Sequence, residues 1–145
     1  MNVNQLKIIL DTVRVQPDLA PHDGETFCNI ALDRVLGLCG IPRMVGENGA
    51  PLMANEMIDF MRESPDYAKI NGDAACARAS QGILVIACQQ EEGHGHVCPV
   101  YPATMEMSGS WGKTVPMVSN VGRTVGVMRV SQAFKTEPDY YAVGT

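Results

Sequence analysis

The chain has 145 residues, of which 46% are hydrophobic and 19% charged, a composition typical of one globular domain with a sizeable core. Eleven basic and sixteen acidic residues give a net charge of −5, and no basic cluster is present, which disfavours nucleic acid as a partner. The longest apolar run, ILVIAC at 83–88, is too short to cross a bilayer, and charged residues interrupt the N-terminal apolar pattern. We therefore expect a single domain over residues 1–145, synthesised in the cytoplasm without a signal peptide and with no membrane partner.

Apolar residues at helical spacing predict four helices in the first half of the chain. The second of these helices is expected to begin after Thr26 as its cap, to carry Cys28 at the N-terminal end of its apolar face, and to stop at Gly40. The predicted helical ranges are 3–15, 27–39, 52–62 and about 73–80.

After Gly82 the pattern changes to short β-type runs. Helices followed by strands that run back and forth predict an α+β fold, with the N-terminal helices packed on one side of an antiparallel sheet. The expected strands are 83–89, 96–102, 114–120, 124–130 and 140–143.

Cys28 is the first candidate for chemistry. A helix N-terminus presents partial positive charge and unpaired N–H groups, which favour a thiolate and can hold an oxyanion. The alternative is that Cys28 only fills the core, because free cysteine is among the most buried residue types. The five cysteines form no C-x-x-C pair and are odd in number, so we expect free thiols in a reducing compartment, with Cys39, Cys76 and Cys88 structural.

A nucleophilic cysteine needs a base, and EEGHGHVCPV offers two histidines where a glycine-flanked loop enters a strand. His96 begins the strand and shares a face with Cys98, a face expected to turn toward the helices, whereas His94 lies in the loop. The alternative is that one or both histidines are surface loop residues. His94, His96 and Cys98 also alternate as zinc ligands would on one strand face, but no second ligand pair accompanies them, so we expect no metal.

Asn120 is the candidate for orienting the base. It closes the strand TVPMVSN, from which an amide can reach the second ring nitrogen of a histidine on the neighbouring strand. The alternative role for Asn120 is turn formation. We interpret Trp111 and the methionines of the third helix as packing residues.

Three segments together resemble the papain-like cysteine hydrolases of bacterial cell walls, the NlpC and CHAP amidase/peptidase group. They are TFCNIALDRVLGLCGIP, LMANEMIDFM and AACARASQGILVIACQQEEGHGHVCPVYP, spanning residues 26 to about 102. The chain is most similar there to the amidase effectors of type VI secretion and to phage-encoded wall hydrolases.

The resemblance implies a papain-like fold in which Cys28 is the nucleophile, His96 the base and Asn120 the third member. It implies cleavage of an amide in the peptide part of peptidoglycan through an acyl-enzyme, without a cofactor, after injection or lysis-type release. An immunity or inhibitor protein is then an expected partner. Two alternatives stay open, namely another acyl-transfer reaction such as deamidation or cross-linking, and a non-catalytic module such as a phage virion component.

Overall fold

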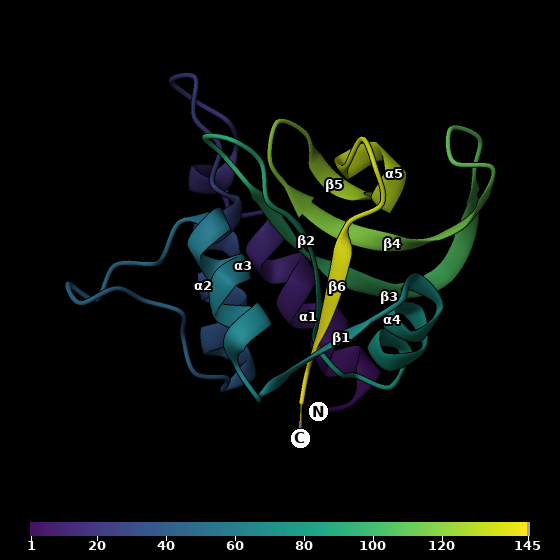
Figure 1. Ribbon diagram of the computed structural model, residues 1–145, viewed down its shortest axis with the longest axis horizontal. Coiled ribbons are helices and arrows are strands. Elements are labelled where there is room, and N and C mark those ends of the chain that lie inside the picture. The colour runs from purple at the N-terminus through teal and green to yellow at the C-terminus, as the bar shows by residue number, and fades with distance from the viewer. Residues whose placement is uncertain (145) are drawn as a thin grey trace.

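The computed structural model of the protein describes residues 1–144, which form one sheet with helices on both of its faces (Figure 1). Five α-helices and a short 3₁₀ helix are present in this range. The α-helices are α1 (Val3–Arg14), α2 (Cys28–Cys39), α3 (Ala54–Glu63), α4 (Gly72–Ser80) and α5 (Val130–Ala133), and the 3₁₀ helix is Pro17–Leu19. The strands are β1 (Tyr67–Ile70), β2 (Val85–Gln89), β3 (His96–Ser108), β4 (Lys113–Val121), β5 (Val125–Arg129) and β6 (Asp139–Val143).

The sheet has the strand order β1-β6-β2-β3-β4-β5, and every neighbouring pair is antiparallel. The expected strands from residue 83 onward are all present, and β2 to β5 form the predicted meander. The last strand then returns to pair with β2 and with β1, a strand of four residues that the sequence pattern missed. The α+β class is thus confirmed.

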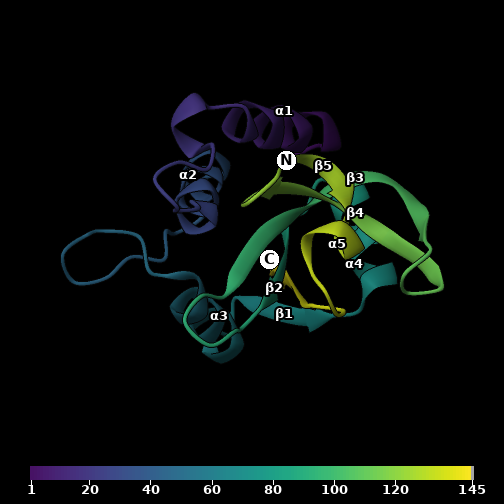
Figure 2. The ribbon, with the colours of Figure 1, turned by 90° about the horizontal axis from the view of Figure 1, so that it is seen from above.

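The expectation that the helices lie on one side of the sheet is wrong. The alternate residues of β2 belong to two separate cores, because Ile86 and Cys88 pack with α1, α2 and α3 while Val85 and Ala87 pack with α4. Figure 1 shows α2 and α3 to the left of the sheet and α4 and α5 to its right, and Figure 2 shows α1 beside α2. A central strand buried on both faces gives the unbroken apolar run seen in the sequence.

The helix that carries Cys28 begins one residue later than predicted. Phe27, not Thr26, is the N-cap of α2, and it makes no side-chain capping hydrogen bond, so no N-cap side chain occupies the first-turn N–H groups. The helix ends as predicted, because Gly40 adopts the left-handed conformation (φ 70°) that glycine tolerates best.

The middle of α2 is held by an ion pair between a buried carboxylate and a half-exposed guanidinium. Asp33, only 8% exposed, accepts two hydrogen bonds from Arg43 at 2.7 and 2.8 Å, which joins the helix to the segment that follows it. No helix within residues 1–144 is both long enough and apolar enough to span a membrane.

Candidate active site

A histidine and an asparagine from neighbouring strands form a direct pair. Nε2 of His96, the first residue of β3, lies 2.7 Å from Oδ1 of Asn120, near the end of β4. The amide nitrogen of Asn120 donates to the Thr124 carbonyl at 2.9 Å, which turns the amide oxygen toward the ring. Because that oxygen only accepts, Nε2 carries the hydrogen, and Nδ1 of neutral His96 keeps a free lone pair.

The Asn120 side chain therefore contacts the imidazole and also spans the β4–β5 turn. The amide is only 3% exposed. The pairing of β3 with β4 runs from Val100↔Val118 toward Ser108, so the Asn120 side chain, and not a backbone ladder, joins the two strands near His96.

Neighbouring residues bury much of the His96 ring. The ring centroid lies 5.0 Å from that of Phe134, and a Cβ at Gly122 would approach Cε1 of the histidine to 3.2 Å. Burial lowers the pKa of the His96 imidazole, and the Asn120 hydrogen bond and the Glu91 carboxylate oppose this lowering. His96 is therefore neutral at pH 7 and able to accept a proton.

The face occupied by His96 differs from the expectation. Cys98, two residues on, belongs to the core on the side of α4 and α5, whereas Val97 packs with Cys28 and α2. His96 thus shares its face with Phe134 and not with the helix that bears the thiol. The thiol lies beside the backbone of Val97, the residue after His96, whereas the imidazole packs on Phe134.

Cys28 is the first residue of α2, and it is 8% exposed. The backbone N–H groups of Val97, Asn29 and Cys28 itself lie near its sulfur and favour the thiolate. The Val97 contact places the sulfur beside the peptide bond that joins Val97 to His96. The start of α2 and the start of β3, which are far apart in the sequence, are brought together there.

The protonation state of Cys28 differs from the one expected for a helix N-terminus. Burial raises the pKa of the Cys28 thiol, and the three backbone N–H groups lower it by less than burial raises it. The resting pair is therefore a neutral thiol and a neutral imidazole, and a thiolate forms only when a base removes the proton.

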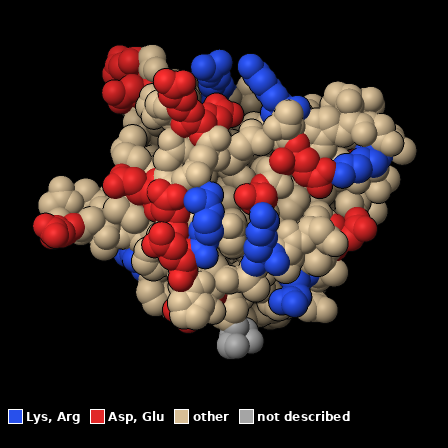
Figure 3. Space-filling model, in the orientation of Figure 1, with Lys and Arg blue, Asp and Glu red and all other residues tan. Residues whose placement is uncertain are grey.

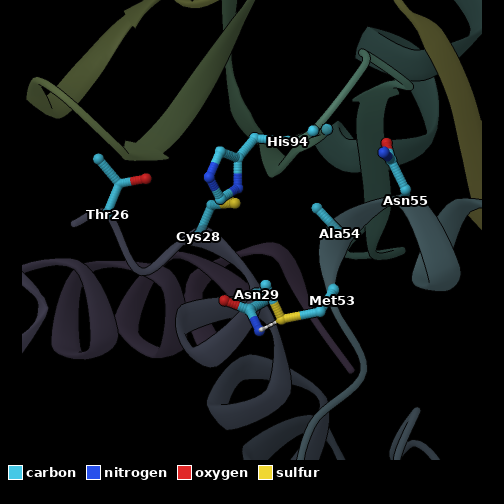
Figure 4. A pocket seen from close by; sticks show the side chains of 9 residues that line it. Thr26, Cys28, Asn29, Met53, Ala54, Asn55 and His94 are labelled. Atoms are coloured by element: carbon cyan, nitrogen blue, oxygen red, sulfur yellow. Dashed lines mark hydrogen bonds between the residues drawn. The ribbon is translucent and has the colours of Figure 1, made fainter.

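Two adjoining cavities give access to these groups. A small cavity of about 70 Å³ is lined by Cys28, and a cleft of about 750 Å³ is lined by His96 and Asn120. Both cavities are lined by Thr26, Asn29, Met53, His94 and Gly95. Figure 4 shows His94 and Thr26 around Cys28, with Met53 and Asn29 below them.

The loop between β2 and β3, which carries His94, is attached to α3. Asn55 donates to the Glu91 carbonyl at 2.8 Å and accepts from the Glu91 N–H at 3.3 Å. A Cβ at Gly95 would lie 2.1 Å from the Asn55 side-chain oxygen, so only glycine fits there. Asn55 was not singled out as a site residue from the sequence, although it stands in the ANEM segment that contributed to the resemblance.

The other residues considered from the sequence lie elsewhere or act differently. Trp111 packs with the core on the α4 side, and its indole N–H donates to the Lys135 carbonyl at 3.2 Å. Met53, interpreted as a packing residue, instead lines both cavities. Within residues 1–144 no group of three or more His, Cys, Asp or Glu side chains is arranged to hold a metal ion, so His94, His96 and Cys98 do not form the zinc set considered above.

No known family model matches the chain, and a search of curated proteins finds no match either. The function is therefore argued from the geometry of Cys28, His96 and Asn120 and from the resemblance described above.

Proposed function

We propose that the protein is a cysteine amidase or endopeptidase that cleaves an amide bond in the peptide part of peptidoglycan. The observation that carries the proposal is the position of the Cys28 sulfur. It lies at an uncapped helix N-terminus and beside the His96–Val97 peptide bond, and His96 is itself oriented by Asn120. These are the nucleophile, base and orienting group of an acyl-transfer site.

The proposed reaction starts from the neutral pair. Nδ1 of His96 takes the thiol proton as the sulfur attacks the carbonyl carbon, and the Asn120 oxygen stabilises the imidazolium that forms. The N–H groups of Cys28 and Asn29 donate to the oxyanion. His96 then gives its proton to the departing amine, which leaves Cys28 acylated. Water, deprotonated by His96, attacks the thioester and releases the acid, and the thiol is restored.

The choice of substrate and the papain-like assignment of the fold are supported by the resemblance. A nucleophilic cysteine on a helix, followed in the chain by a strand that starts with the base, is the order that the cell-wall cysteine hydrolases share. We propose that the protein acts on the wall after injection or lysis-type release, with an inhibitor that covers the Cys28 cleft as a partner. The reaction needs no cofactor.

The proposal is tested by digestion of purified peptidoglycan with Cys28→Ala, Cys28→Ser and His96→Gln variants. Cys39→Ala is the matched control, because Cys39 is the last residue of the same helix and does not line either cavity. We expect all three site variants to lose at least about a thousandfold in rate while remaining folded, and Cys39→Ala to keep full activity. Unchanged digestion by Cys28→Ala would refute the assignment.

A second candidate, a non-catalytic binding or structural module, is favoured by the burial of Cys28 within the larger hydrophobic core. The alkylation rates of the five thiols distinguish the two. If His96 activates Cys28, Cys28 is alkylated faster than Cys88 and Cys98 near pH 7, and His96→Gln slows its alkylation. If Cys28 only packs in the core, it is alkylated as slowly as Cys88 and Cys98. Incorporation of an added amine in place of water would instead indicate cross-linking or another transfer reaction.

A further inference from the structure

The larger cleft has two walls of opposite charge. Arg123, in the turn between β4 and β5, and Lys135, just after α5, line the cleft on one side. Glu25, before α2, and Glu91, in the loop between β2 and β3, line it on the other. These segments gather at the top of Figure 1, with the acidic pair on segments to the left. Figure 3 shows Lys and Arg side chains along the same upper edge, beside acidic ones.

The four charged groups have no partner among residues 1–144. In the part of the chain that the structure describes, none of these side chains takes part in an ion pair or a side-chain hydrogen bond. All four residues are exposed. By contrast, seven other basic groups, including Arg34 with Asp18 and Lys113 with Glu137, are paired. The charges that line the cleft are therefore available to a ligand.

Backbone contacts fix the positions of Arg123 and Lys135. The carbonyl of Lys135 accepts the indole N–H of Trp111, and Phe134 before it packs on His96. Arg123 follows Gly122, whose missing side chain leaves room for the imidazole, and precedes Thr124, whose carbonyl is held by Asn120. Both cations are thus attached to segments that also support the His96–Asn120 pair, so a group bound by them lies at a set position relative to the site.

We propose that Arg123 and Lys135 are specificity-determining residues, which hold a free carboxylate of the substrate on the α5 side of the scissile amide, while Glu25 and Glu91 hold a cationic group on the α2 side. Guanidinium and ammonium groups suit a carboxylate ligand, the former through two parallel hydrogen bonds. Each wall of the cleft attracts groups of the opposite charge. The preferred substrate is then a peptide of opposite charge at its two ends, bound in one direction.

This inference rests on the proposed function, but its test needs no hydrolysis. Iodoacetate and iodoacetamide alkylate the same sulfur, and they differ in charge. The ratio of their rates at Cys28, followed by peptide mapping, therefore reports the electrostatic potential in the cleft. We expect the double variant Arg123→Gln, Lys135→Gln to lower the iodoacetate-to-iodoacetamide ratio about three- to tenfold at low ionic strength, and the difference to shrink in high salt.

The matched controls also replace charged side chains with glutamine, but at other positions. Glu25→Gln with Glu91→Gln should raise the ratio, and Arg78→Gln should leave it unchanged, because Arg78 is an exposed cation on α4 that does not line the cleft. In the wild type, the dipeptide Ala-Glu should protect Cys28 from iodoacetamide better than its diamide does, and the Arg123, Lys135 double variant should abolish the difference.

A ratio that the basic-pair variant leaves unchanged, equal protection by the two peptides, or no reaction of Cys28 with either reagent would overturn the inference. The first two outcomes are separate from failure of the proposed function, which by itself would appear as an alkylated, charge-selective Cys28 in a protein that digests no peptidoglycan. A Cys28 that reacts with neither reagent would overturn both proposals.

Discussion

Replacing Asn120 with alanine tests the central pair of the site. The substitution removes the acceptor 2.7 Å from His96 Nε2 and leaves a buried N–H without a partner, which costs about 1–3 kcal/mol. The carbonyl of Thr124 also loses its donor, but Thr124 is exposed and water can replace the amide. We therefore expect Asn120→Ala to lower the free energy of unfolding by about 1–3 kcal/mol, or roughly 2–4 °C in Tm for each kcal/mol.

The same substitution should move the pKa of His96 in a known direction. The Asn120 oxygen accepts from Nε2–H and favours the imidazolium, so it raises the pKa that burial lowers. Asn120→Ala should lower this pKa further, and Asn120→Asp should raise it, because a carboxylate stabilises the positive charge more than an amide does. The two variants thus shift one titration in opposite directions.

The measurements are urea unfolding and an NMR titration of the His96 ring. Ser119→Ala is the matched control, since Ser119 is the preceding buried polar residue of β4 and its hydroxyl accepts from Arg14 at 2.9 Å instead of meeting His96. It should lose stability without moving the His96 pKa. A His96 pKa that is the same in the wild type, Asn120→Ala and Asn120→Asp would refute the reasoning.

Three further predictions follow from the same structure. Because the pKa of His96 is lowered in the folded state, the unfolded chain binds the proton more readily. The free energy of unfolding should therefore fall by up to about 1.4 kcal/mol per pH unit as the pH drops below about 6.5. Urea unfolding at several pH values should show a weaker pH dependence of this free energy in His96→Gln. Gly95→Ala should displace the β2–β3 loop, seen as faster proteolysis there and slower alkylation or turnover at Cys28, whereas Gly109→Ala, which meets no atom within 4 Å, should not. Arg43→Ala should cost about 1–3 kcal/mol by leaving the Asp33 charge unpaired, and Asp33→Asn in the same chain should recover part of the loss; no recovery in the thermal melts would contradict this.

The sequence by itself determined the features that depend on neighbouring residues. Helical spacing of apolar residues located α1 to α4 to within about two residues, and Gly40 marked the end of α2 because a left-handed residue is a local requirement. The strands β2 to β6 were predicted from another local feature, namely short runs of β-branched and other apolar residues. The position of Cys28 at the start of a helix also followed from local pattern, although its cap did not, since Phe27 makes no capping hydrogen bond that a sequence signal could report.

Only the tertiary structure decided which distant groups meet and what environment they share. The partnership of His96 with Asn120, the insertion of β6 between β1 and β2, and the placement of α4 opposite α2 all depend on pairing and packing between segments far apart in the chain. The raised pKa of Cys28 has the same origin. A helix N-terminus acts through local dipoles, but desolvation comes from the core that closes around the sulfur, and no pattern within α2 encodes how complete that closure is.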